Sequence, residues 1–137
     1  MDVPVLDWLL PKLNVIPVNQ EGIDRSALKA LIRVLKSGNA ALVFPEGART
    51  LDGDLQPAQP GLGLVIAKTL APVVPMRIFG GHEALPRGGG GLHFVPITIV
   101  VGGPIFFAAA DLESPGKDLY GRLSERVMDA IALLRLD

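Results

Sequence analysis

The sequence contains no cysteine and few aromatic residues, and each shortage narrows the class of protein. Without cysteine the chain can form neither disulfides nor thiolate metal sites. Its two histidines, His82 and His93, are too few for a histidine-rich cluster, so we expect no metal site. Aromatic residues make up 5% of the 137 residues and hydrophobic residues 49%, which predicts an aliphatic core.

A large net charge is also missing, since the formal charge at pH 7 is −1. Such a chain has no broad positive field, and nucleic acid is therefore excluded as a partner. The mean hydropathy of +0.40 is high for a soluble protein. Residues 94–110 carry no charge, but their prolines, glycines and β-branched centre predict a buried strand and a turn rather than a membrane-spanning helix. The N-terminus shows no signal-peptide pattern, and we expect one soluble or peripheral domain over residues 1–137.

Strand and helix patterns alternate along the chain. Asp24 is placed to cap one helix, and Pro60 suits the first turn of another. The patterns predict strands at 14–18, 40–44, 73–79 and 97–101, and helices at 25–37, 60–70 and about 119–134. This order predicts an α/β fold with three layers, in which helices flank a largely parallel central sheet.

The most informative segment begins at the last residue of the expected strand at 40–44 and reads Phe44-Pro45-Glu46-Gly47-Ala48-Arg49-Thr50. Open α/β sheets bind their ligands at the carboxyl ends of strands. The planar guanidinium of Arg49 can bind a phosphate or carboxylate through two parallel hydrogen bonds. Gly47 lets the backbone approach an anion closely. The segment therefore predicts a phosphate site.

The same segment resembles the FPEGTRS motif of the glycerolipid acyltransferases. Other segments resemble further motifs of that family in the same order, so that the resemblance covers about residues 5–107. They are Ile16-Pro17-Val18-Asn19, residues 35–39, the set Gly53, Leu55, Pro57 and Gly61, then Val73-Val74-Pro75-Met76, Leu85-Pro86-Arg87-Gly88 and Gly102-Gly103-Pro104-Ile105.

The family moves an acyl group from a coenzyme A or carrier-protein thioester to a hydroxyl of a glycerol phosphate or lysophospholipid, with no cofactor besides that co-substrate. The resemblance implies that Glu46, Gly47, Ala48, Arg49 and Thr50 bind the acceptor phosphate, and that Glu46 holds Arg49 or the acceptor in position. It also implies that Pro75 borders the acyl-donor site. The alternative for Pro75 is an edge strand or a bulge. The implied location is cytoplasmic, peripheral on a membrane.

Three features depart from the family pattern. The family's general base is the histidine of a His-x4-Asp motif, but Arg87 lies five positions after His82, and Thr98 lies five after His93. We therefore expect the catalytic residues upstream of Met1 and regard the chain as N-terminally incomplete. Gln20 and Gln59 stand where the family usually has basic residues, which leaves Arg49 as the main positive charge of the site.

A second class of protein remains open: a non-catalytic module that binds lipid or phosphate. Arg25, Lys29, Arg33 and Lys36 recur at helical spacing and form one basic stripe. The stripe is either a solvated helix face or a contact with anionic lipid headgroups. Nothing in the sequence decides the oligomeric state.

Overall fold

The computed structural model describes residues 12, 15–16, 24–87, 89, 91–113 and 118–136. These residues belong to two compact units, Met1–Ala41 and Leu42–Asp137. Each unit is described by itself below. The expected single domain over residues 1–137 stays a prediction.

The first unit contains helix α2 (Arg25–Lys36), which confirms the helix expected at 25–37. The carboxylate of Asp24 accepts hydrogen bonds from the backbone N–H groups of Ser26 at 2.9 Å and Ala27 at 3.1 Å. Asp24 is therefore the predicted N-cap, which satisfies two of the N–H groups that a helix leaves unpaired at its start. Of the strand expected at 14–18, residues 15 and 16 are described and are not in a strand, and the other three lie outside the described residues.

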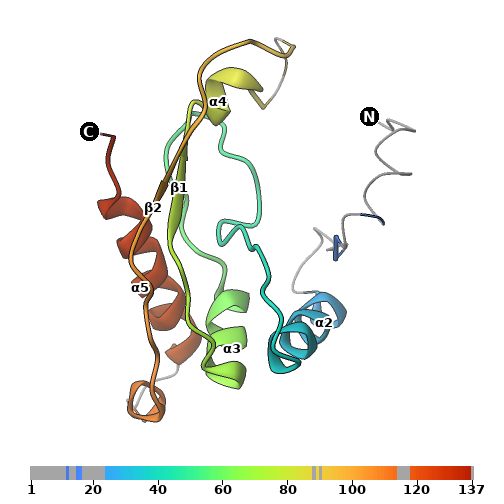
Figure 1. Ribbon diagram of the computed structural model, residues 1–137, viewed down its shortest axis with the longest axis vertical. Coiled ribbons are helices and arrows are strands. Elements are labelled where there is room, and N and C mark those ends of the chain that lie inside the picture. Colours follow the sequence, from blue (N-terminus) through green and yellow to red (C-terminus); the bar gives the residue numbers. More distant parts are fainter. Residues whose placement is uncertain are drawn as a thin grey trace. The chain divides into compact units, whose positions relative to one another are not determined.

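In its described residues the second unit contains six further elements, and Figure 1 labels all of them except the short 3-10 helix at residues 109–112. In chain order they are α3 (Pro60–Thr69), β1 (Met76–Phe79), α4 (Gly81–Ala84), β2 (Thr98–Val101), the 3-10 helix η2 (Ala109–Leu112) and α5 (Leu119–Leu133). Pro60 occupies the first turn of α3, as predicted. The short helix α4 was not predicted, because its sequence falls in a glycine-rich connection.

Strands β1 and β2 pair in antiparallel fashion, with Met76 opposite Val101 and Phe79 opposite Thr98. The expected largely parallel sheet is thus not confirmed, since the sheet of the described residues has these two strands alone. The expected strand at 40–44 is wrong, because this segment is not in a strand. Leu42 and Phe44 are 72% and 64% exposed, and an apolar extended segment becomes a strand only when another strand supplies its hydrogen-bond partners.

The core of the second unit lies between α3 and α5, which pack along one another. Its buried members are one side chain from α3, one from the segment before η2 and three from α5, namely Ile66, Phe107, Leu123, Val127 and Ile131. The predicted aliphatic character is confirmed except at Phe107. Arg77 ties β1 to the end of α5 by donating to the carbonyls of Ala132 at 3.2 Å and Leu134 at 3.1 Å.

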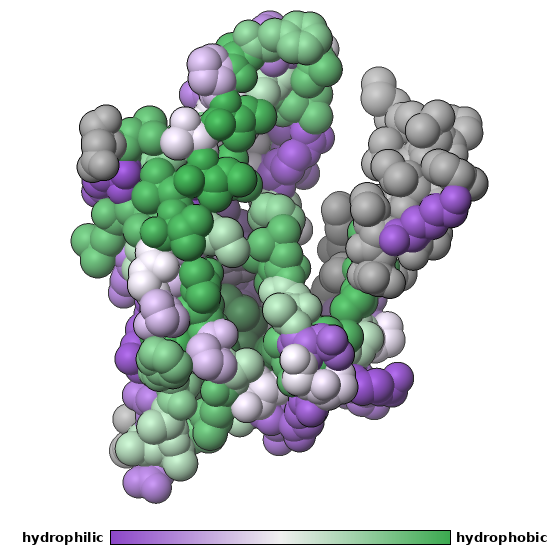
Figure 2. Space-filling model, viewed as in Figure 1, coloured by the Kyte–Doolittle hydropathy of each residue, from purple (hydrophilic) through white to green (hydrophobic). Residues whose placement is uncertain are grey.

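Apolar surface gathers over β1 and β2 in the view of Figure 2. Two cross-strand pairs, Met76 with Val101 and Ile78 with Ile99, are between 42% and 59% exposed. No helix formed by the described residues is long and apolar enough to cross a membrane.

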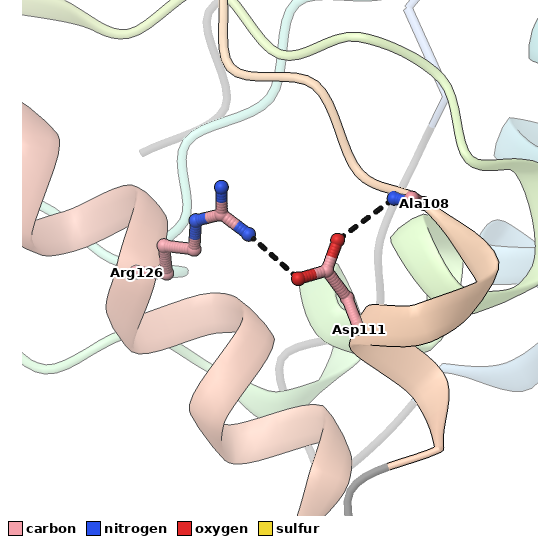
Figure 3. Close-up of polar contacts among 3 residues, drawn as sticks. All are labelled: Ala108, Asp111 and Arg126. Carbon is pink, nitrogen blue, oxygen red and sulfur yellow. Dashed lines mark hydrogen bonds and ion pairs between the residues drawn. The ribbon is translucent and has the colours of Figure 1, made fainter.

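A polar contact holds α5 against η2. The carboxylate of Asp111 accepts one hydrogen bond from the backbone of Ala108 at 2.7 Å and one from Arg126 at 3.1 Å (Figure 3). The guanidinium of Arg126 also lies 4.8 Å from the centre of the Phe107 ring. Arg126 therefore covers the edge of the core as well as pairing with Asp111.

Candidate functional site

A pocket of about 370 Å³ opens within the second unit, where the motif segment and the loop before α3 face each other. Four of the five residues predicted to bind the acceptor line it, namely Glu46, Ala48, Arg49 and Thr50. The remaining lining residues are Leu51, Asp52, Gln56, Pro57, Ala58, Gln59 and Arg87. The motif therefore shares one cavity with Arg87, which lies almost forty positions further along the chain.

Gly47, the fifth predicted residue, shapes the turn that leads into the pocket. Its backbone N–H donates to the carbonyl of Phe44 at 3.1 Å, so this amide is engaged within the turn. Its φ of +74° lies in the left-handed region, which favours glycine. A Cβ at this position would also lie 3.0 Å from Cγ of Gln59. The left-handed turn thus favours glycine here, and a larger residue would also require a small shift of the Gln59 side chain.

Glu46 braces the loop that forms the opposite wall. Its Oε2 accepts a hydrogen bond from the backbone N–H of Gln56 at 2.6 Å. Across the same loop, the N–H of Gln59 donates to the carbonyl of Pro45 at 2.8 Å. In the described part of the chain, the one ion pair joins Arg126 to Asp111. Glu46 and Arg49 therefore form no ion pair among the described residues. The observed contact of Glu46 is with the loop backbone.

Thr50 and Asp52 form a compact turn at the pocket rim. The Thr50 hydroxyl donates to Oδ1 of Asp52 at 2.7 Å and accepts from the N–H of Gly53 at 3.1 Å. The N–H of Asp54 donates to the same carboxylate at 3.1 Å. The Thr50 hydroxyl first, and the Asp54 amide second, hold the pKa of Asp52 below its usual value. The loop of Asp52 therefore favours the ionised form of its carboxyl group.

Arg49 and Arg87 tie two distant segments together. Nη1 of Arg49 donates to the carbonyl of Leu85 at 3.3 Å, and Nη1 of Arg87 donates to the carbonyl of Arg49 at 2.9 Å. Both side chains belong to exposed residues, and both line the pocket. The sequence did not predict Arg87 as a site residue. Arg87 reaches Arg49 only because the connection after α4 folds back toward the motif segment.

Pro75 lies directly before β1 and is buried. Its carbonyl accepts a hydrogen bond from Gly102 at 2.8 Å, so the proline takes part in strand pairing through the one backbone group that it has. It does not line the pocket described above, and its role at an acyl-donor site stays a prediction. Gln59 does line the pocket, whereas Gln20 lies outside the described residues.

Comparison with known proteins shows the family of the chain. The family described as Acyltransferase matches residues 1–79, and the chain belongs to this family. It is 32% identical to the 1-acyl-sn-glycerol-3-phosphate acyltransferase BAT2, chloroplastic, of Brassica napus, over 80% of this chain and 33% of that protein. It is 30% identical to LPAT1, chloroplastic, of Arabidopsis thaliana, over 80% of this chain and 32% of that protein. These names confirm the resemblance to the glycerolipid acyltransferases.

A bacterial relative, the 1-acyl-sn-glycerol-3-phosphate acyltransferase of Bacillus subtilis, is 26% identical over 89% of this chain and 58% of its own length. The chain thus spans about a third of the length of the two plant relatives and somewhat more than half of the bacterial one. No solved structure matches it significantly.

Proposed function

We propose that this chain supplies the acceptor-binding part of an O-acyltransferase of phospholipid biosynthesis. The acyl group comes from an acyl-CoA or acyl-carrier-protein thioester and goes to a hydroxyl of a glycerol phosphate or lysophospholipid. Relatives of the chain carry the name 1-acyl-sn-glycerol-3-phosphate acyltransferase, which supports an acceptor with a phosphate group. The acceptor phosphate binds in the pocket of the motif segment.

The observation that carries this proposal is the position of Arg49 in the pocket. Its Nη1 donates a hydrogen bond to the carbonyl of Leu85. The guanidinium has further N–H groups for which no described residue is an acceptor. It also makes no ion pair within the described ranges. An arginine that faces a cavity without a carboxylate partner is suited to an anionic ligand. Glu46 fixes the facing wall through Gln56, and its second oxygen can accept from a hydroxyl of the acceptor.

The binding of sn-glycerol 3-phosphate by the full chain tests this site. Calorimetric titration of the wild type is expected to show binding, and Arg49→Gln is expected to weaken it about tenfold or more, since a hydrogen bond to a charged group contributes about 1.5–3 kcal/mol. Lys68→Gln removes one positive charge from an exposed position on α3, outside the pocket lining, and is the matched control. Equal affinities of wild type and Arg49→Gln would contradict the site.

Acyl transfer separates the enzyme part from a non-catalytic lipid- or phosphate-binding module, which is the alternative. Neither histidine of the chain stands in a His-x4-Asp motif. The chain alone is therefore expected to bind the acceptor but not to transfer an acyl group from acyl-CoA to lysophosphatidic acid. If acyl transfer appears when a polypeptide with a His-x4-Asp motif is added to the chain, the result supports the enzyme part. If the chain binds the acceptor but no acyl transfer appears even then, the result favours the non-catalytic binding module. Acyl transfer by this chain alone refutes the argument from the missing base.

The chain is proposed to lie on a membrane surface, on the cytoplasmic side, and the basic stripe of α2 supports the membrane contact. Arg25, Lys29, Arg33 and Lys36 are all exposed, and the helix has no acidic residue. Each basic residue near an anionic bilayer contributes about 1 kcal/mol. We expect the chain to sediment with vesicles that contain anionic lipid and not with purely zwitterionic ones. The double change Lys29→Gln with Arg33→Gln should release it, and unchanged sedimentation would remove α2 from the membrane contact.

A further inference from the structure

We propose that Arg87 is a second anion-binding arginine of the acceptor pocket, and that Arg49 and Arg87 together select a phosphomonoester over a phosphodiester. The inference rests on the proposed function, because it assigns a residue and a ligand class to the same pocket. It begins from two guanidinium groups that come from segments 38 positions apart and line one cavity.

Two hydrogen bonds link the segments that carry the two arginines. Arg87 donates to the backbone carbonyl of Arg49 at 2.9 Å, and Arg49 donates to the backbone carbonyl of Leu85, two residues before Arg87, at 3.3 Å. Each of these contacts uses one Nη1 atom. The other N–H groups of both forks remain for a ligand, because no further hydrogen bond is found for them within the described residues.

The two carboxylates of the pocket make their hydrogen bonds with groups other than the arginines. Glu46 and Asp52 also line the cavity, but the observed partners of Glu46 and Asp52 are backbone amides and the Thr50 hydroxyl. In the described part of the chain, neither carboxylate forms an ion pair with Arg49 or Arg87. Two like charges that line one pocket without an ion-pair partner among the described residues repel one another, and a bound anion of higher charge relieves more of that repulsion.

The ligand class follows from the number of donors and from the charge. A phosphomonoester carries a charge of about −1.5 to −2 at pH 7 and three terminal oxygens. Two guanidinium forks can bond all three oxygens, whereas a phosphodiester has one charge and only two terminal oxygens to offer. Arg87 also supplies a second positive charge to a pocket in which Gln59 is neutral. A site with both arginines therefore discriminates between the two classes of headgroup.

Calorimetric titrations of the full chain with sn-glycerol 3-phosphate and with sn-glycero-3-phosphocholine, at one fixed salt concentration, test the inference. We expect wild type to bind the monoester about tenfold more tightly than the diester. Arg87→Gln should lose about tenfold for the monoester and no more than about threefold for the diester, so that the preference largely disappears. Arg87→Lys keeps the charge but not the fork and should retain an intermediate preference. Lys68→Gln should change neither affinity.

The preference, rather than the affinity alone, distinguishes ligand binding from a structural role. If Arg87 only braced the loop of Arg49, then Arg87→Gln would weaken both ligands by the same factor, and this result overturns the inference. An unchanged preference in both Arg87 variants also overturns it. If Arg49→Gln abolishes binding while the Arg87 variants keep the wild-type preference, the proposed function stands and this inference fails. If wild type binds neither ligand, both fail.

Discussion

The hydroxyl of Ser124, on α5, accepts a hydrogen bond from the backbone N–H of Gly63, on α3, at 2.8 Å. The same hydroxyl donates to the carbonyl of Gln59 at 3.1 Å, and Ser124 has no exposed surface. An α-helix would join Gly63 and Gln59 directly, so the serine is inserted into the first turn of α3. Because Gln59 lines the pocket, this contact connects the helical core to the candidate site.

Replacing Ser124 by alanine should therefore destabilise the protein. The change removes the partner of a buried N–H and one partner of the Gln59 carbonyl, and an unpaired buried group costs about 1–3 kcal/mol. We expect the free energy of unfolding, measured by urea denaturation, to fall by that amount. Ser37→Ala removes an exposed hydroxyl that bonds a helix carbonyl and should change stability by less than about 0.5 kcal/mol. Similar effects of the two changes would contradict this account.

Gly63 also marks the closest approach of α3 and α5. A Cβ at Gly63 would lie 1.8 Å from the backbone oxygen of Tyr120, which cannot turn away as a side chain could. Gly63→Ala must therefore separate the helices, and we expect a loss of about 3 kcal/mol in unfolding free energy. Gly103→Ala is the matched control, since a Cβ there meets nothing within 4 Å. A stable Gly63→Ala protein with unchanged α3–α5 contacts would contradict the geometry.

The helices could be predicted from the sequence because their signals are local. Asp24 and the apolar spacing after it fix α2, and Pro60 fixes the start of α3. The strands were predicted less well: β1 and β2 lie within the strands expected at 73–79 and 97–101, but the strand expected at 40–44 is absent. Residues 40–44 have the composition of a buried strand, but pairing depends on a partner elsewhere in the chain, and the segment is exposed.

The residues of the candidate site also differ in whether local sequence signals predict them. Its motif is continuous in sequence, so Glu46, Ala48, Arg49 and Thr50 could be named in advance, and they do line one pocket. Arg87 could not be assigned to it, because its position depends on the long-range hydrogen bonds from Arg87 to the Arg49 carbonyl and from Arg49 to the Leu85 carbonyl. The inserted hydroxyl of Ser124 depends on the packing of two helices and leaves no local signal either.

The ion pair between Asp111 and Arg126 should contribute little through charge alone. The side chains are 34% and 48% exposed, so solvent screens their attraction. A double-mutant cycle with Asp111→Asn and Arg126→Gln is expected to give a coupling of about 0.2–1 kcal/mol that falls as salt is added. A coupling above about 2 kcal/mol, or one that does not respond to salt, would show that the pair is far less exposed to solvent than these fractions indicate.

The turn of Thr50 and Asp52 should respond to acid. The hydrogen bond from Thr50 holds the pKa of Asp52 below the usual value of about 3.9, so the turn is favoured above that pH and loses this support as the pH falls through the lower folded pKa. Thr50→Val removes the largest cause and should raise the pKa of Asp52. Titration of its carboxyl carbon by NMR measures the change. Thr98→Val, on β2, should leave the pKa of Asp52 where it is in wild type, and an equal pKa in Thr50→Val would refute the assignment.

Glu46 has two separable contributions to anion binding, and two substitutions distinguish them. Its carboxylate braces the loop through the N–H of Gln56, but its negative charge faces the same pocket as two arginines. Glu46→Gln keeps an oxygen for the brace and removes the charge, so the affinity for inorganic phosphate should rise about two- to fivefold, as expected for removal of about 1 kcal/mol of repulsion near a protein surface. Glu46→Ala removes both and should loosen the loop, which lowers the affinity despite the lost charge. The measurement is calorimetric titration with inorganic phosphate, which carries no hydroxyl arm of an acceptor to complicate the comparison. A lower affinity in Glu46→Gln would mean that the carboxylate holds Arg49 in its binding position, as the sequence motif first suggested.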